Sequence, residues 1–199
     1  MPLAESQSAT APRRLPGVEG VWVFVGADMM FFAILFISFM VDRGADPAVF
    51  EAGRLSLNPD FGGVNTLILL ASSWFVVMAV ESAKADRRVE VQRWLLAAFG
   101  CGLAFGISKA FEYGQKLAIG ITPASGDFYM YYFALTGLHL VHVLVGSIVL
   151  FVLWIKARRH ACSRQGFVVL ECGAIYWHMV DLLWIFLFPL LYLMRQAQL

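Results

Sequence analysis

Five long runs of apolar residues dominate this sequence, and each is long enough to cross a lipid bilayer. They lie at about residues 20–41, 63–80, 93–113, 128–155 and 170–194, and short polar connectors separate them. Backbone surrounded by lipid must satisfy its own hydrogen bonds, which a helix does within one segment. The sequence therefore predicts an all-α integral membrane bundle of five transmembrane helices, a single domain over residues 18–199. An Ala-, Ser- and Pro-rich tail at 1–17 is expected to be disordered.

Composition agrees with a membrane protein and excludes some other classes. Hydrophobic residues make up 60% of the chain and charged residues 15%, a balance outside the range of ordinary soluble domains. A net charge of +1 gives no reason to expect nucleic acid as a partner. The three cysteines are scattered and form no CxxC pair, so neither a disulfide framework nor a thiolate metal site is predicted.

The distribution of Lys and Arg predicts the orientation of the bundle, because cytoplasmic connectors of membrane proteins carry more of these residues. One side of the predicted bundle receives Arg13, Arg14, Lys84, Arg87, Arg88, Arg93, Lys156, Arg158, Arg159 and Arg164. The other side receives only Arg43, Arg54, Lys116 and Arg195. We therefore predict a cytoplasmic N-terminus and a periplasmic C-terminus. The basic residues Arg158, Arg159 and Arg164 could also meet anionic lipid head groups.

Three of the predicted spans carry ionisable residues near their middle. At 1.5 Å rise per residue, Asp28 falls about 12 Å into the first span. His139 and His142 lie near the middle of the fourth span, and His178 and Asp181 near the middle of the fifth. Glu171, His178 and Asp181 also share one helical stripe. Ionisable groups inside a membrane almost always face protein or water rather than lipid, so these five mid-span residues predict a shared buried polar layer.

The chemistry of this layer admits more than one interpretation. Asp28 is either a carboxylate that moves protons or holds a partner group, or an acid that only fixes helix packing. His139 and His142, spaced i, i+3, could bind a metal, or one of them could ligate haem with His178 as the second ligand. The competing interpretation, which we favour, is that both imidazoles hydrogen-bond across helices. We predict no metal site, because no open site with a carboxylate triad is apparent.

Three further features lie near span ends and have local explanations. Glu112 lies three residues after Lys109 and four before Lys116, so ion pairing at the membrane interface is a sufficient explanation. Glu171 is expected at the cytoplasmic interface. Pro189 is expected to kink the fifth span slightly toward its outer end.

Two long stretches of the sequence resemble subunit III of the haem-copper oxidases. They are FEYGQKLAIGITPASGDFYMYYFALTGLHLVHVLVGS and GFVVLECGAIYWHMVDLLWIFLF, and the similarity continues upstream through GADMMFF and VNTLILLASS. It covers nearly all of the chain from Gly20 to Tyr192. The segments KAFEYGQK and DFYMYY look most like the nitric oxide reductase-associated, NorE-type branch, and the short subunit III of quinol oxidases is the near neighbour.

The resemblance implies an accessory subunit of an oxidoreductase complex that is not catalytic alone and binds no cofactor except structural phospholipid. Its implied partner is the catalytic subunit I of a haem-copper oxidase or nitric oxide reductase, in the bacterial inner membrane. There it supports stability, proton uptake or gas access. Asp28 matches the family's membrane-embedded carboxylate, usually Glu. Matches to family-typical polar positions are Glu112, His139, His142, Glu171, His178 and Asp181. The two initial helices of the long family members, which partly wall a lipid cleft, are absent.

Two other functions remain as alternatives at this point. A membrane cytochrome would use His178 with His139 or His142 as axial haem ligands. A small proton- or ion-conducting protein would use the whole polar layer as a relay. A visible spectrum of the isolated chain distinguishes the first alternative, and a vesicle assay for decay of a pH gradient distinguishes the second.

Overall fold

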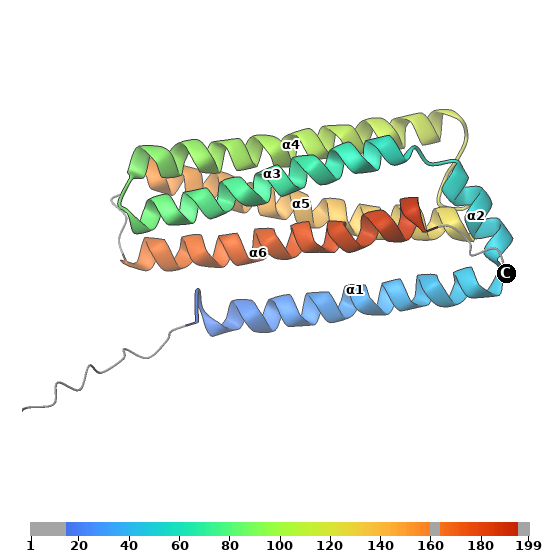
Figure 1. Ribbon diagram of the computed structural model, residues 1–199, viewed down its shortest axis with the longest axis horizontal. Coiled ribbons are helices and arrows are strands. Elements are labelled where there is room, and N and C mark those ends of the chain that lie inside the picture. The colour runs from blue at the N-terminus through green and yellow to red at the C-terminus, as the bar shows by residue number, and fades with distance from the viewer. Residues whose placement is uncertain (1–14, 160–163, 195–199) are drawn as a thin grey trace, which may run out of the picture.

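The chain is described by a computed structural model covering residues 15–159 and 164–194. Of the tail expected at 1–17, only 15–17 fall within the described residues. Every element of the described chain is a helix (Figure 1). Five of the helices are long and apolar enough to cross a membrane, which confirms the predicted fold class.

The membrane helices alternate in direction along the bundle (Figure 1). They are α1 Glu19–Ala45, α3 Pro59–Lys84, α4 Arg88–Ala118, α5 Asp127–Arg159 and α6 Arg164–Phe188. The first four are longer than the apolar runs that predicted them, because the helical backbone continues through polar residues at the ends. Helix α6 begins before its predicted span and ends at Phe188, short of the predicted end. In α4, for example, the predicted core of 93–113 extends to Arg88 and Ala118.

One helix was missed in the sequence. The connector after α1, for which no helix was predicted, contains α2, Pro47–Leu55. Pro47 stands in the first turn of this helix, where its missing N–H costs nothing. Phe50 is buried and contacts the rings of Phe39 and Phe128. The helix therefore forms where one aromatic side chain can anchor it, at the end of the bundle where α1 ends.

The π-helical turn η1, Pro189–Leu193, follows α6 directly. Proline has no N–H to donate to the preceding turn, and its ring crowds the carbonyl there. At the position where a slight kink was expected, the chain forms this widened turn. This turn fixes the direction of Tyr192, whose side chain is buried.

The helices form one bundle in which α3 packs along α4, α4 along α5, and α6 against both α3 and α5. Trp177 of α6 fills the space between the helices at two glycines. A Cβ at Gly146 would lie 2.7 Å from this indole, and one at Gly102 would lie 2.9 Å from it. Small residues of this kind allow close helix packing in membranes.

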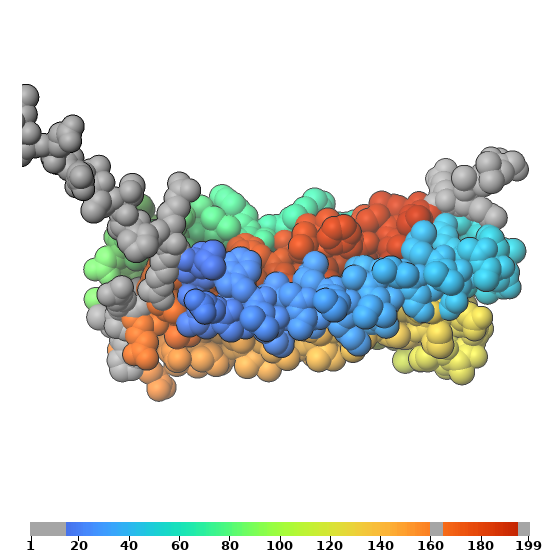
Figure 2. Space-filling model, turned by 90° about the horizontal axis from the view of Figure 1, so that it is seen from below, coloured from blue at the N-terminus to red at the C-terminus, as the bar shows by residue number. Residues whose placement is uncertain are grey.

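The first helix is the least embedded. Helix α1 packs mainly on α6 and leaves much of its surface uncovered, as Figure 2 shows along its whole length. Its two ends are fastened by polar contacts. Glu171 Oε2 accepts a hydrogen bond from the Gly17 N–H at 3.0 Å, and Arg43 donates to the Met194 carbonyl at 2.6 Å.

Candidate functional site

The predicted polar layer is divided into three separate contacts in the structure. In the first, α1 meets α5: Asp28 Oδ1 lies 3.2 Å from His142 Nε2. The other ring nitrogen, Nδ1, donates to the Leu138 carbonyl at 2.8 Å, because a carbonyl can only accept. One proton must therefore occupy the contact between Nε2 and Oδ1, either on the imidazole or on the carboxyl group. Asp28 Oδ2 is buried and has no hydrogen-bond partner among the described residues.

The second contact joins α6 to α3. Ser73 Oγ lies 2.6 Å from His178 Nδ1 and is also hydrogen-bonded to the Asp181 side chain. Within the described chain, Asp181 Oδ1 is buried and has no such partner. A single hydroxyl thus connects the two ionisable residues that α6 places one turn apart.

The third contact joins α5 to α6 and is entirely buried. His139 Nε2 donates to the Val180 carbonyl at 3.0 Å. The imidazole packs against Phe105, with ring centroids 5.4 Å apart, and against Trp184, at 5.1 Å. Both imidazoles thus form a hydrogen bond across helices, His142 to Asp28 and His139 to a backbone carbonyl rather than to an acidic side chain or a tyrosine. No direct hydrogen bond joins one of the three contacts to another among the described residues.

A second polar cluster was not recognised in the sequence. Lys109 and Glu112 were expected to pair at the membrane interface, and that expectation of exposure is wrong. Lys109 is 0% exposed and Glu112 is 5% exposed. Both residues face Tyr132 of α5 and Tyr192 of η1 and therefore lie inside the bundle. Lys116 does not extend the pair as expected; its ammonium donates to the Ser56 carbonyl at 2.6 Å.

We call Lys109, Glu112, Tyr132 and Tyr192 the charged cluster. Lys109 Nζ lies 2.8 Å from Glu112 Oε2 and donates to the Tyr192 hydroxyl at 3.0 Å. Both tyrosines donate to Glu112 Oε1, Tyr132 at 2.7 Å and Tyr192 at 2.6 Å. The ammonium also lies 5.2 Å from the ring centroids of Tyr132 and Trp184. Every charged atom in this buried group is therefore compensated, as buried charge requires.

The cluster depends on several elements being in place. Helix α4 supplies the ion pair, α5 supplies Tyr132, and η1 supplies Tyr192. The carbonyl of Tyr192 accepts a hydrogen bond from Arg54 Nη1 at 3.4 Å. Glu51 holds that arginine at 2.6 Å and 3.0 Å, and these hydrogen bonds raise the pKa of Arg54 above its ordinary value.

Trp184 connects the cluster to the polar layer. Its indole contacts both the His139 ring and the Lys109 ammonium, and its Nε1 donates to Thr66 Oγ1 at 2.9 Å. A sequence signal for this arrangement did exist. Lys109 and Glu112 are spaced i, i+3 in a largely apolar segment, and tyrosines occur in the next two spans. This pattern could have predicted a buried ion pair with tyrosine hydroxyls as hydrogen-bond partners.

The chemical capacity of these residues is to bind helices together and to hold a proton. In residues 15–159 and 164–194, no three His, Cys, Asp or Glu side chains are grouped so that they could hold a metal ion. At the Asp28–His142 contact a carboxyl group and an imidazole lie 3.2 Å apart. Glu171 lies apart from these residues, in the N-terminal part of α6. Its carboxylate accepts a hydrogen bond from the Gly17 N–H, just before α1 begins.

Comparison with known proteins settles what kind of chain this is. Residues 14–196 match the family described as cytochrome c oxidase subunit III. The chain belongs to the cytochrome c oxidase subunit III family. This confirms the resemblance seen in its segments TGLHLVHVLVGS and YWHMVDLLWIFLF, and it agrees with a multi-pass membrane protein.

Relatives within the family come from different kinds of oxidase. The cytochrome bo(3) ubiquinol oxidase subunit 3 of Pseudomonas putida is 29% identical, covering 89% of this chain and 85% of the relative. The cytochrome c oxidase subunit 3 of Corynebacterium diphtheriae is 28% identical, and the match covers 96% of this chain and 97% of the relative. The cytochrome c oxidase subunit 3 of Synechocystis is 31% identical, and the match covers 88% of this chain and 74% of the relative. The family is thus shared by quinol and cytochrome c oxidases.

Proposed function

We propose that this chain is a non-catalytic accessory subunit of a respiratory haem-copper complex in the bacterial inner membrane. The observation that carries the proposal is the subunit III family match across residues 14–196. Its partner is the catalytic subunit I, and it supports the stability or proton supply of that subunit. The Lys and Arg distribution favours a cytoplasmic N-terminus and a periplasmic C-terminus.

The contacts of the ionisable residues support an accessory role. The charged cluster and His139 are used to hold α4, α5 and α6 together. Asp28 differs from them, because it lies on the least embedded helix, pairs with His142, and has one oxygen without a partner among the described residues. We place the contact with the catalytic subunit along α1. Asp28 then supplies a proton-holding group beside that contact.

The partner is either a terminal oxidase or a nitric oxide reductase. The relatives described above are oxidase subunits by name. The segments KAFEYGQK and DFYMYY favour the nitric oxide reductase-associated branch. The two partners differ in substrate, so the rate of oxygen or nitric oxide consumption by a co-purified complex identifies which one is present.

The direct test is purification through an affinity tag on this chain, first from its native membranes in mild detergent and then from a host that lacks partner subunits. We expect a haem-containing catalytic subunit to co-purify from the native membranes. The chain produced alone should show no Soret band. Stoichiometric haem in the isolated chain would refute the proposal in favour of a cytochrome. Absence of any haem-copper subunit from the native preparation would equally refute it.

A further inference from the structure

The imidazole of His178 lies at the surface of the bundle, near the middle of α6. The side chain is partly exposed, and its Nδ1 is hydrogen-bonded to Ser73 Oγ at 2.6 Å. Its Nε2 has no hydrogen-bond partner within residues 15–159 and 164–194, and unlike His139 Nδ1 it is not sealed inside the bundle. A polar atom at this depth meets hydrocarbon unless another protein covers it, and leaving it unpaired there is costly.

The single hydroxyl hydrogen of Ser73, which bonds to both His178 and Asp181, determines where the imidazole hydrogen lies. If the serine donates to Nδ1, the imidazole carries its hydrogen on Nε2 and a protonated Asp181 donates to the serine. If the serine donates to a charged Asp181, neutrality requires a charged imidazole, with hydrogens on both nitrogens. A bare Nε2 would need a net negative charge in the membrane, or an acid hydrogen on Asp181 Oδ1, which is buried without a partner in the described chain. Nε2 is therefore a hydrogen-bond donor at the surface.

Apolar side chains surround this donor on α3 and α6, and we call them together with His178 the His178 strip. They share the helical faces of Ser73 and His178 and are 38–43% exposed. They are Leu70 and Val77 on α3, and Leu182 and Ile185 on α6. Figure 1 shows α6 between α3 and α1, and in Figure 2 the red surface of α6 remains visible beside the blue surface of α1. The strip therefore continues the uncovered face of α1.

We propose that the catalytic subunit contacts this chain along the His178 strip as well as along α1, and that one of its transmembrane helices presents an oxygen acceptor to His178 Nε2. This contact rests on the proposed function and adds a face and a chemical group to it. A lipid head group cannot supply the acceptor, because the middle of the bilayer lies about 15 Å from either head-group region. A second copy of this chain cannot supply it through a symmetric contact at the strip, since one Nε2–H would face another. The acceptor is therefore a Ser, Thr, Asn or Gln oxygen, or a backbone carbonyl at a break in the partner helix.

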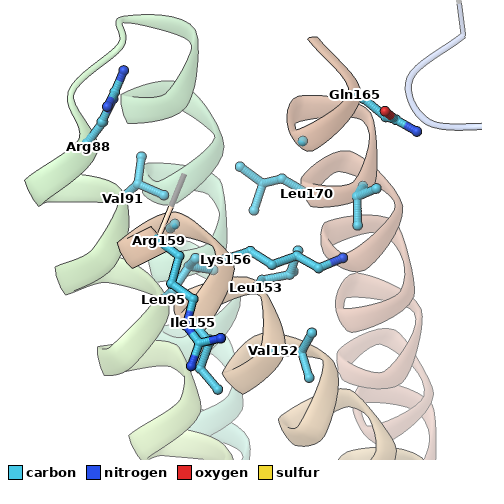
Figure 3. Close-up of a pocket in the computed structure, with 13 residues that line it drawn as sticks. Arg88, Val91, Leu95, Val152, Leu153, Ile155, Lys156, Arg159, Gln165 and Leu170 are labelled. Atoms are coloured by element: carbon cyan, nitrogen blue, oxygen red, sulfur yellow. The ribbon is translucent and has the colours of Figure 1, made fainter. Parts of the chain in front are cut away.

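The position of the contact is tested by photo-crosslinking with p-benzoylphenylalanine in native membranes that contain the whole complex. Incorporated at Leu182, one turn from His178, the reagent should form an adduct with the haem-containing catalytic subunit. Met30 on α1, which is 67% exposed, reports the α1 contact separately. The controls are Leu103 on α4, 45% exposed, and Val152 on α5, 43% exposed, which lines a cavity among α4, α5 and α6 (Figure 3). Neither control should form this adduct.

The donor is tested by His178→Asn and His178→Gln, because an Asn amide reaches the position of Nδ1 and a Gln amide that of Nε2. We expect His178→Asn to weaken the association about 3- to 10-fold, measured as haem retained per tagged chain across a dilution series in mild detergent. His178→Gln should retain most of the affinity. The melting temperature of the isolated His178→Asn chain should not fall, because its hydrogen bond to Ser73 remains.

Three outcomes would overturn the proposal while leaving the accessory function intact, because the catalytic subunit still co-purifies in each. The first is no catalytic-subunit adduct from Leu182, or an adduct there with any other polypeptide. The second is an equal yield of that adduct from Leu182 and the two controls. The third is unchanged haem retention by His178→Asn. If no haem-containing subunit co-purifies at all, the proposed function itself fails, and this contact fails with it.

Discussion

Glu112→Gln is the substitution for which the structure gives the largest expected effect. The change keeps the shape of the side chain but removes the only carboxylate that contacts Lys109 in the charged cluster. It leaves an ammonium group that is 0% exposed without its ion pair, and it weakens the two tyrosine hydrogen bonds. Removing one partner of a buried pair typically costs about 3–5 kcal/mol. For a chain of this size that corresponds to a fall in melting temperature of about 6–20 °C.

The assay is thermal stability of the detergent-solubilised chain, measured as the fraction that remains monodisperse in size-exclusion chromatography after heating. The matched control is Glu81→Gln in α3. Glu81 and Lys84 are also paired at i, i+3, with 2.7 Å between charged atoms, but their side chains are 57% and 53% exposed. An exposed pair of this kind is worth about 0–1 kcal/mol, so the control should shift the melting temperature by no more than a few degrees.

The double variant Lys109→Met with Glu112→Gln sharpens the test. With the ammonium gone, no uncompensated charge remains, so the double variant should be more stable than Glu112→Gln alone. The reasoning would be refuted if Glu112→Gln and Glu81→Gln lowered the melting temperature equally. It would also be refuted if the double variant lost as much stability as the two single changes added together.

Three further predictions follow from the packing and from the polar layer. Gly146→Ala places a methyl group against Trp177 and should cost about 1–3 kcal/mol, whereas Gly100→Ala, with open space around it, should not destabilise the chain in the same heating assay. Asp181→Leu removes a buried carboxylate and its hydrogen bond to Ser73, so it should reduce assembly, at a cost of about 1–3 kcal/mol; normal yield of the complex would contradict this. Asp28→Asn should leave assembly intact but reduce the number of turnovers that the complex sustains before it loses activity. Unchanged turnover kinetics over long reactions would leave only a packing role for this residue.

Hydrophobicity was enough to predict the five membrane helices, because lipid leaves a membrane-length apolar run few alternatives to a helix. Hydrophobicity predicted the ends of these helices poorly. Helix α5 continues through Lys156 to Arg159, whereas the apolar run that predicted it stops at residue 155. Hydrophobicity also missed α2, whose formation depends on Phe50 finding a place between rings from α1 and α5.

The polar residues show a similar division. Of the polar residues that sequence spacing assigned to the interior of α5 and α6, His139 and Asp181 are buried, whereas His142 and His178 are partly exposed. Their partners depend on how the helices rotate against each other. His178 pairs with Ser73, a residue that attracts no attention in the sequence. Lys109 and Glu112 were assigned to the surface because local pairing explained them sufficiently. Only the fold shows that Tyr192, delivered by the turn at Pro189, completes their environment. The orientation and the functional use of the polar layer stay predictions.

Two kinds of buried polar group are present, and they are expected to respond differently to mutation. The charged cluster has its charges compensated within the chain, so losing one member should destabilise the isolated subunit. Asp28 keeps one buried oxygen without a hydrogen-bond partner among the described residues, and such an atom is costly unless water or another chain supplies one. Asp28→Asn should therefore change the melting temperature of the isolated chain little, and its effect should appear only when the catalytic subunit is bound. Equal loss of stability from Glu112→Gln and Asp28→Asn in the isolated chain would show that both residues serve the bundle alone.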